Sequence, residues 1–325
     1  MNYTALLLTP LICFAISLLI LRGLLSTAAQ GFLLDQPNAR SLHVDPVSRT
    51  GGLGIMLGLL VGVCIMQRGP LLILALAGAL MLLSVVDDWQ GLPAVVRLAG
   101  HLAAAGTFVA ATLTNGHPLA LLVLAVWVGW MTNLYNFMDG ADGLAGGMTV
   151  AGFIAYGVAA LGAGDAQFAV LGFSVAASAC AFLLFNFPPA RIFMGDAGSV
   201  PLGFLAGAVG IAGWQNALWP IWFPVIVFSP FIVDATATLA ARALRREKIW
   251  HAHRSHYYQR LVIMGWTHRK LARAEYLLMS ISAIAGVLAL GRAPVLQVAV
   301  IAALLALYLA VGLNIDRRWR ARVVS

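Results

Sequence analysis

Residues 122–147 read LVLAVWVGWMTNLYNFMDGADGLAGG, an apolar run without charge that ends in two aspartates. A helix needs about 20 predominantly apolar residues to cross a bilayer, and the run meets that length. Asp139 and Asp142 then close it, although a carboxylate inside hydrocarbon costs at least about 2.5 kcal/mol. Ionisable groups in such segments are functional by default, so the stretch predicts a membrane-spanning helix with a polar site at its end.

The composition of the whole chain is that of a membrane protein. Of 325 residues, 61% are hydrophobic and 10% are charged, whereas soluble domains carry about 25% charged residues. Because apolar runs recur throughout, we predict an all-α integral membrane protein that forms one domain over residues 1–325. Its first segment lacks a basic start and a small-residue cleavage site and is interpreted as an anchor. About eleven spans, or ten, are expected near 3–25, 51–67, 70–86, 95–113, 118–137, 145–163, 166–186, 199–213, 216–240, 276–290 and 294–313.

Lysine and arginine are distributed unequally between the predicted loops. The outside loops hold only Arg68 and Arg292 if the N-terminus is outside. The positive-inside rule therefore predicts a cytoplasmic C-terminus. The net charge of +8 suits anionic lipid heads and phosphates, and the absence of any nucleic-acid-reading module predicts no nucleic-acid partner. The inside loops hold Arg40, Arg49, Arg97, Arg191, a basic loop from Arg242 to Arg273, and a tail with Arg317, Arg318, Arg320 and Arg322.

Most acidic residues fall on the same predicted side as the basic loops. They stand at the ends of different helices, and only Asp165 falls outside. This distribution predicts a site at the membrane surface, not a pore through the membrane. The inside aspartates in the loops and at the helix ends are Asp35, Asp45, Asp87, Asp88, Asp139, Asp142, Asp196 and Asp234.

The polar residues at the end of the fifth predicted span share one helical face. Asn133, Asn136 and Asp139 are spaced three residues apart, and the glycines that follow break the helix and allow close approach of a ligand. A few carboxylates, completed by substrate phosphates and water, usually hold Mg²⁺. The alternative is that Asp139 and Asp142 cap the next helix.

Two further acidic motifs support a metal site. The adjacent Asp87 and Asp88 end a helix, where the negative end of the dipole disfavours them unless a metal or a cationic loop lies nearby. Alternatively, they form a solvated helix end. Asp196, in the turn FMGDAGS, suits a metal ligand, and its alternative role is a helix N-cap.

The basic loop is interpreted as a donor loop. His251, His253 and His256 alternate with Arg254, which can pair bidentately with phosphate oxygens. Zinc binding is disfavoured because no cysteine or closing ligand accompanies the histidines. A loop that only contacts anionic lipid is the main alternative.

Six stretches carry a resemblance, in chain order LDQPNARSLHVDPVSRTGGLGI, VVDDWQG, NLYNFMDGADGLAGG, FNFPPARIFMGDAGS, PFIVDATATLAARALRR and HAHRSHYYQRL. Together they resemble the polyprenyl-phosphate N-acetylhexosamine-1-phosphate transferase superfamily, glycosyl transferase family 4. In that family a prenyl phosphate, such as undecaprenyl phosphate, accepts a sugar 1-phosphate from a UDP-sugar, UMP leaves, and Mg²⁺ is required. The resemblance implies a multi-pass enzyme of the bacterial inner membrane with a cytoplasmic active site.

The resemblance also implies residue roles. Asp196 would be the principal Mg²⁺ ligand with Asn136 beside it, and Mn²⁺ is an alternative ion. The family's acidic pair, matched by Asp87 and Asp88, activates or positions the prenyl phosphate. The nucleotide and metal region is matched by Asn133, Asn136 and the catalytic candidates Asp139 and Asp142, and the substrate-binding loops are matched by Arg49, His251, His253, Arg254 and His256.

Departures from the family pattern favour one branch. Gly91 stands where the family often has Asp or Lys, and Arg97 is a candidate for the missing cation. The spaced histidines and PNARSLH resemble the initiators of O-antigen and common antigen. The expected donor is therefore UDP-GlcNAc, or a 6-deoxy relative such as UDP-QuiNAc or UDP-FucNAc. The alternatives are the phospho-N-acetylmuramoyl-pentapeptide transferase of peptidoglycan synthesis and, in another class, a secondary transporter, and a homodimer stays open.

Overall fold

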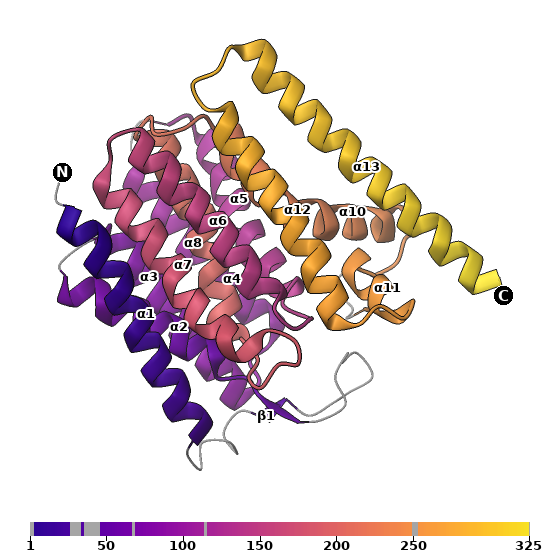
Figure 1. The fold of residues 1–325 in the computed structure, drawn as a ribbon, viewed down its shortest axis with the longest axis horizontal. Helices are drawn as coiled ribbons and strands as arrows, with labels where there is room; N and C mark the ends of the chain where they lie inside the picture. The colour runs from indigo at the N-terminus through magenta and orange to yellow at the C-terminus, as the bar shows by residue number, and fades with distance from the viewer. Residues whose placement is uncertain are drawn as a thin grey trace.

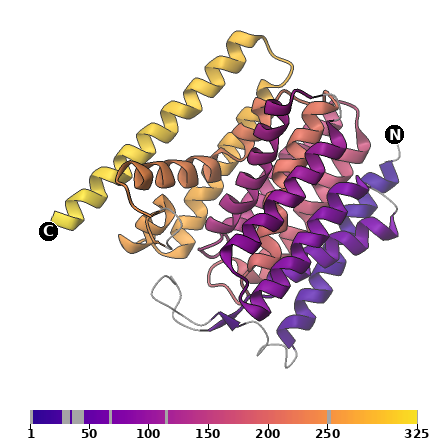
Figure 2. The same ribbon diagram turned by 180° about the vertical axis from the view of Figure 1, so that it is seen from behind.

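A computed structural model describes residues 3–26, 34–35, 46–66, 69–113, 116–248 and 253–324 (Figures 1 and 2). The strands Leu34–Asp35 (β1) and Val47–Ser48 (β2) pair antiparallel, and all other described elements are helices. The helices are α1 Tyr3–Ser26, α2 Gly51–Ile65, α3 Leu71–Gln90, α4 Ala94–Thr112, α5 Pro118–Phe137, α6 Leu144–Gly162, α7 Ala166–Asn186, α8 Asp196–Gln215, α9 Trp222–Val227, α10 Ser229–Leu244, α11 Tyr257–Ile263, α12 His268–Ala289 and α13 Pro294–Val324.

Among the described residues, 9 helices are long and apolar enough to cross a membrane. The helix α2 is equally apolar but has only 15 residues. The predicted all-α integral membrane fold is confirmed, whereas the predicted count of about eleven spans is not. The nine helices are α1, α3 to α8, α12 and α13.

The predicted span 216–240 is not one helix. It is divided between α9, with 6 residues, and α10, with 16 residues, and Phe228 separates them. Pro230 lies in the first turn of α10. Proline has no N–H to donate and favours the first turn of a helix, so a new helix begins there with a new direction. Figures 1 and 2 show α10 running across the direction of α12.

Small residues allow α1 and α2 to approach closely. Gly54, Gly58 and Gly62 recur every four residues along α2, and a Cβ at each would collide with a side chain of α1. Ser17 and Cys13 fill the places opposite Gly58 and Gly62. Close packing of small residues is a main source of helix association in membranes, where the apolar lipid removes the hydrophobic driving force.

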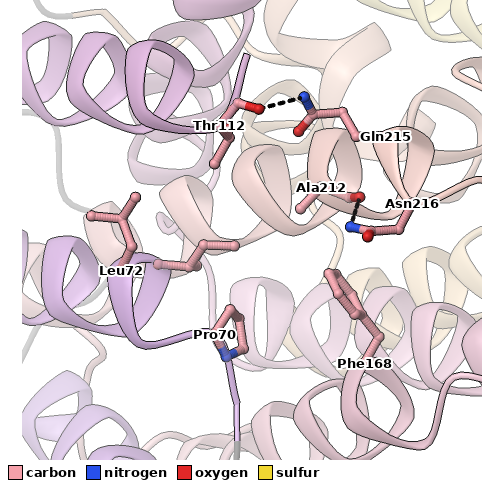
Figure 3. A pocket seen from close by; sticks show the side chains of 8 residues that line it. Pro70, Leu72, Thr112, Phe168, Ala212, Gln215 and Asn216 are labelled. Atoms are coloured by element: carbon pink, nitrogen blue, oxygen red, sulfur yellow. Dashed lines mark hydrogen bonds between the residues drawn. The ribbon is translucent and has the colours of Figure 1, made fainter. Parts of the chain in front are cut away.

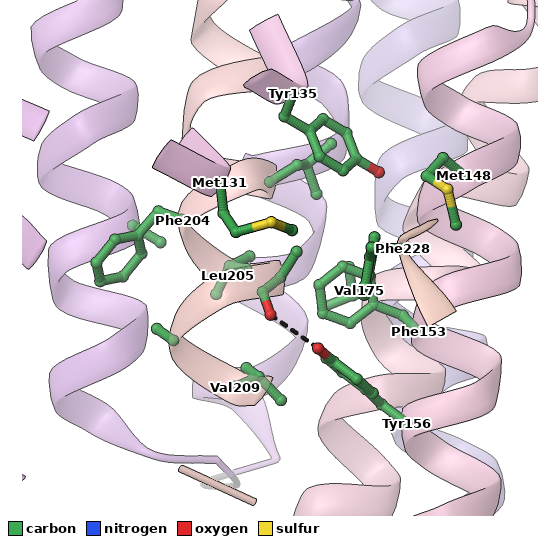
Figure 4. Packing of buried hydrophobic residues seen from close by; sticks show 14 of the residues in the cluster. Met131, Tyr135, Met148, Phe153, Tyr156, Val175, Phe204, Leu205, Val209 and Phe228 are labelled. Carbon is green, nitrogen blue, oxygen red and sulfur yellow. Dashed lines mark hydrogen bonds between the residues drawn. The ribbon is translucent and has the colours of Figure 1, made fainter. Parts of the chain in front are cut away.

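The helix α8 forms the centre of the bundle. Its residues from Ala197 to Gly213 are buried, and Figure 4 shows Leu205 and Val209 of α8 beside Met131 of α5 and Tyr156 of α6. The hydroxyl of Tyr156 on α6 donates to the carbonyl of Ala206 at 2.9 Å. Gly203 has no side chain and lies against the backbone of Met131 on α5. This packing holds the first residue of α8 in a defined position beside the last turn of α5.

Candidate active site

The C-terminal end of α5 and the N-terminal end of α8 meet through polar side chains. Nδ2 of Asn136, on the last turn of α5, donates to Oδ2 of Asp196, the first residue of α8, at 3.2 Å. The hydroxyl of Ser199 donates to Oδ1 of Asn136, also at 3.2 Å. These bonds orient the Asn136 amide beside Asp196. The structure therefore brings together the two residues that the family resemblance implies as Mg²⁺ ligands.

The turn before Asp196 packs on the segment that follows β2. Gly195 has a φ of 70°, and a Cβ there would lie 2.5 Å from the carbonyl oxygen of Arg49. Glycine adopts this left-handed conformation without the steric cost that other residues incur. Arg49 lies near enough for its charge to stabilise the carboxylates of Asp88 and Asp196. The predicted substrate residue of the first loop is thus at the site.

Arg97, near the start of α4, connects the acidic pair to α8. Its Nη1 lies 3.1 Å from Oδ2 of Asp87 and 3.8 Å from Oδ2 of Asp196. The other Asp87 oxygen accepts a hydrogen bond from the backbone N–H of Leu92 at 2.8 Å. The arginine offsets the unfavourable position of Asp87 at a helix C-terminus. The sequence marked Arg97 only as a candidate cation.

The carboxylates of Asp87, Asp88 and Asp196 form what we call the acid cluster. Oδ2 of Asp88 is buried and has no hydrogen-bond partner among the described residues. A buried, unpaired carboxylate oxygen is costly, and a bound cation would satisfy it. In the part of the chain that the structure describes, there is no group of three or more His, Cys, Asp or Glu side chains that could hold a metal ion by itself. Mg²⁺ does not need one, because it is usually held by one or two carboxylates with water and substrate phosphates.

Asn133 links α5 to α4. Its two amide atoms have partners outside the acid cluster. Its Oδ1 lies 3.3 Å from Nδ1 of His101, and its Nδ2 donates to the carbonyl of Gly129 at 2.7 Å. His101 is buried and stands four residues after Arg97, on the same face of α4. The sequence analysis missed His101, although the four-residue spacing from Arg97 was a usable signal. The predicted substrate contact of Asn133 stays a prediction.

Asp142 binds two segments that are distant in sequence. Its Oδ2 accepts from the backbone N–H of Ala190 at 3.0 Å, and its Oδ1 lies 3.0 Å from Nδ1 of His268 at the start of α12. The N-cap of α6 is Gly143, so the alternative in which Asp142 caps that helix is wrong. Both carboxylate oxygens have protein partners, which indicates that Asp142 holds this turn in place. A direct catalytic role stays a prediction.

The turn after α5 also contacts residues 253–258, which we call the histidine loop. The hydroxyl of Tyr258 donates to the carbonyl of Phe137 at 3.1 Å, and any side chain at Gly140 would collide with that hydroxyl. Phe137 also stacks on His256, with ring centroids 6.4 Å apart. Asp139 lies half-buried in the same turn, and its N–H donates to the carbonyl of Asn136 at 3.2 Å. The tertiary structure thus joins two motifs that the sequence separates by more than a hundred residues.

Asp234 on α10 organises the histidine loop. Its carboxylate accepts from the backbone N–H groups of Tyr257 and Tyr258 at 2.9 and 3.0 Å, in the first turn of α11. Its Oδ1 also lies 3.2 Å from Nδ1 of His256. A carboxylate at a helix N-terminus satisfies backbone N–H groups that have no partner within the helix. The sequence analysis assigned Asp234 no role, and only the fold reveals its contacts.

The predicted donor residues have different environments. His256 is buried, Arg254 is exposed, and His251 lies outside the described residues. Nδ1 of His253 lies 2.8 Å from the hydroxyl of Ser255. Burial, together with the nearby His256, lowers the pKa of His253 to about 4. His253 is therefore neutral near pH 7, and Arg254 supplies the accessible positive charge of the loop.

The C-terminal part of α13 supports α11 from the other side. Nη1 of Arg260 donates to Oδ1 of Asp316 at 2.8 Å, and Nε donates to the carbonyl of Ser255 at 2.7 Å. The Arg260 guanidinium also lies 4.9 Å from the ring centre of Tyr257. Arg260 is buried, so this ion pair is shielded from water more than a surface pair. The histidine loop is thus held between α10 and α13.

A pocket lies at the other end of the bundle from the acid cluster (Figure 3). It forms where α3 begins and where α4 and α8 end, with Phe168 of α7 at its wall. The side-chain amide of Gln215 donates to the carbonyl of Thr112 at 3.2 Å, and that of Asn216 donates to the carbonyl of Ala212 at 2.7 Å. These polar groups are engaged within the protein, and we assign no ligand to this pocket.

The chain is similar in sequence to known proteins. The family model described as Glycosyl transferase family 4 matches residues 70–214. A Bacillus subtilis protein named "Probable undecaprenyl-phosphate N-acetylglucosaminyl 1-phosphate transferase" is 32% identical over 277 residues, which cover 77% of this chain and 76% of that protein. The chain belongs to glycosyl transferase family 4. It is accordingly a phosphotransferase of the polyprenyl-phosphate sugar-1-phosphate transferase superfamily, as the resemblance implied.

Other relatives within the superfamily match the chain to different extents. The Mycolicibacterium smegmatis protein named "Decaprenyl-phosphate N-acetylglucosaminephosphotransferase" is 29% identical over 76% of this chain and 73% of its own length. The Symbiobacterium thermophilum "Phospho-N-acetylmuramoyl-pentapeptide-transferase" is 34% identical over only 50% of this chain and 48% of its own length. The glycosyl transferase family 4 model includes the acid cluster but neither Arg49 nor the histidine loop.

Proposed function

We propose that this member of glycosyl transferase family 4 transfers an N-acetylhexosamine 1-phosphate from a UDP-sugar to undecaprenyl phosphate and releases UMP. The observation that carries the proposal is the meeting of three helix ends, those of α3, α5 and α8, around Asp87, Asn136 and Asp196. These groups lie at one end of an apolar bundle. A lipid phosphate and a water-soluble nucleotide sugar can meet there.

Mg²⁺ is the proposed cofactor, and Asp196, Asn136 and Asp88 are the residues that would hold it. The unpaired Oδ2 of Asp88 and the carboxylate of Asp196 supply the hard oxygen ligands that this ion prefers. The ion would neutralise charge on the donor diphosphate as UMP leaves. Mn²⁺ has similar ligand preferences and is the proposed substitute.

The transfer needs positioning and charge neutralisation more than covalent catalysis. An oxygen of the prenyl phosphate attacks the β-phosphorus of the donor, a new P–O bond forms, and the anhydride bond to the α-phosphate breaks. A phosphate monoester is already mostly ionised near pH 7, so no strong base is needed. Asp87, held by Arg97 and by the Leu92 N–H, is proposed to position the acceptor phosphate.

The histidine loop is proposed to bind the donor. Arg254 is exposed and retains its guanidinium fork for phosphate oxygens, while Asp234 and Arg260 hold the loop in place. Neutral His253 can donate or accept a hydrogen bond without adding charge. Asp139 follows Phe137, whose carbonyl accepts from Tyr258, by two residues and stands where the histidine loop meets α5. Its proposed role is at the nucleotide.

The donor sugar is proposed to be N-acetylglucosamine or a 6-deoxy relative, for O-antigen or a related surface polysaccharide. The match to the N-acetylglucosamine-phosphate transferases spans about three quarters of the chain, whereas the match to the muramoyl-pentapeptide transferase spans half. The proposed location is the bacterial inner membrane with the acid cluster on the cytoplasmic side, because the basic loops border the same end.

Release of UMP by the purified protein tests the function. UDP-GlcNAc, UDP-QuiNAc, UDP-FucNAc and UDP-MurNAc-pentapeptide are each supplied with undecaprenyl phosphate and Mg²⁺. We expect UMP release that requires the prenyl phosphate and is fastest with one of the first three donors. Release without acceptor, or turnover of the pentapeptide donor alone, would contradict the proposal. A transporter would release no UMP.

A further inference from the structure

Arg97 is a cation already built into the acid cluster. One nitrogen, Nη1, contacts Asp87 at 3.1 Å and reaches Asp196 at 3.8 Å, so a single guanidinium bridges the ends of α3 and α8. The arginine side chain is 39% exposed, whereas the Asp87 side chain is only 9% exposed. One partner of the bridge is therefore fixed in the protein, and the other retains freedom to move toward solvent.

The bridge leaves part of the acid cluster unsatisfied. Arg97 and the nearby Arg49 bring two positive charges to three carboxylates, and Oδ2 of Asp88 has no hydrogen-bond partner among the described residues. The remaining negative charge attracts a divalent cation. The same guanidinium, however, stands next to Asp196, where that cation would bind, and like charges a few ångströms apart repel each other.

We propose that Arg97 is an internal counter-cation that competes with the divalent ion. It joins Asp87 to Asp196 when no ion is bound, and it weakens ion binding until the donor diphosphate brings its own negative charge. The ion is then bound tightly only together with donor. This inference rests on the proposed metal site of the previous subsection, and it assigns Arg97 as a positioning residue that sets the order of loading.

The charge of Arg97 should also determine how strongly the stability of the folded protein depends on the divalent ion. If Arg97 balances the carboxylates in the ion-free protein, chelating the metal should cost the wild type little stability. If Arg97 loses its charge, the three carboxylates repel one another, and a divalent ion becomes the main source of compensation. A ligand that binds only the folded state stabilises it, so the variant should depend on the ion for stability.

Direct binding of Mn²⁺ to the donor-free protein in detergent, measured by electron paramagnetic resonance, tests the competition. We expect Arg97→Gln to bind Mn²⁺ at least about fivefold more tightly than the wild type, the lower end of typical coupling between two binding events. Arg97→Lys keeps the charge and should stay near the wild type. Arg191→Gln removes an exposed arginine that stacks on Phe185, outside the cluster, and should leave Mn²⁺ affinity unchanged.

Thermal unfolding of the same proteins in EDTA and in Mg²⁺ provides the second measurement. We expect Arg97→Gln to lose stability in EDTA and to recover most of it in Mg²⁺, while the wild type changes little. Equal Mn²⁺ affinity in Arg97→Gln and wild type, or no binding in either, would overturn the proposal. So would a stability loss that Mg²⁺ does not restore, or a variant that fails to fold even when purified in Mg²⁺. Neither measurement uses a UDP-sugar, so the failure of this inference and the failure of the proposed transfer reaction are separate results.

Discussion

Nδ1 of His256 lies 3.2 Å from Oδ1 of Asp234, although the two residues are 22 positions apart in the chain. Both side chains are buried. The same carboxylate accepts the first N–H groups of α11, so it determines both the orientation of the imidazole and the direction of the chain that carries it. The histidine loop is therefore an ordered part of the site, and Asp234 is its main anchor.

Replacing Asp234 by Asn should lower kcat/KM roughly ten- to a hundredfold, because hydrogen bonds to a charged acceptor contribute about 1.5–3 kcal/mol. The amide nitrogen cannot accept the N–H bonds that the carboxylate accepts. We expect faster tryptic cleavage after the exposed Arg254 in the same variant. Thr238→Val removes one donor to this carboxylate and keeps its charge, so it serves as the control with a smaller effect. Unchanged cleavage and unchanged activity in Asp234→Asn would refute the anchoring role.

Replacing Asp196 by Asn should remove nearly all transfer activity, while the protein still folds and inserts. The amide keeps the size of the side chain but loses the charge that a divalent ion needs. UMP release at ordinary Mg²⁺ is the measurement. Asp165→Asn makes the same change at the start of α7, where Asp165 accepts from the N–H of Phe168 at 2.9 Å, and it should keep activity. Near-normal turnover of Asp196→Asn would remove this residue from the proposed metal site.

Replacing Arg254 by Lys distinguishes donor binding from lipid binding. Lysine keeps the charge but loses the planar fork that pairs with phosphate oxygens. We expect kcat/KM for the UDP-sugar to fall roughly ten- to a hundredfold in detergent, where a charged bilayer is absent. Arg317→Lys, at an exposed position of α13, is the matched control and should be neutral. Full activity of Arg254→Lys would favour a loop that only contacts anionic lipid.

The low pKa of His253, about 4, predicts how stability depends on pH. An unfolded histidine titrates near pH 6.5, so between about pH 6.5 and 4 the unfolded chain binds a proton that the folded protein excludes. His253 should therefore reduce stability as the pH falls through this range. Thermal unfolding from pH 7 to 4 should show a shallower decline in His253→Gln than in the wild type. Identical slopes would place His253 in a more solvated site.

The proposed topology can be tested with single cysteines in a chain whose Cys13, Cys64 and Cys180 are replaced. A cysteine at Asn115 should react with a membrane-impermeant reagent added outside, and a cysteine at Ala252 should react only after the membrane is opened. The expectation follows from the excess of Lys and Arg in the inside loops. Labelling of the Ala252 position from outside would reverse the orientation of the acid cluster.

The amino-acid sequence was sufficient to predict the class of the protein and the motifs of its candidate site. An apolar run such as 122–131 partitions from water into the membrane independently of its tertiary contacts, because its free energy of transfer depends on its composition. Asp139 and Asp196 were also recognised from composition alone. A carboxylate at the end of an apolar run costs free energy, so it indicates a functional site. The all-α membrane fold followed from such local signals, and the family was implied by the resemblance of the six motifs.

Which of these groups meet depends on the tertiary packing of the helices. The division of 216–240 into α9 and α10, the bridge from Arg97 to Asp196, and the binding of Asp142 to His268 depend on how helices pack. That packing is governed by contacts such as Gly203 against Met131, which link residues far apart in the chain. Local hydropathy contains no information about such pairs, because it records which segments enter the membrane and not which faces they turn to one another.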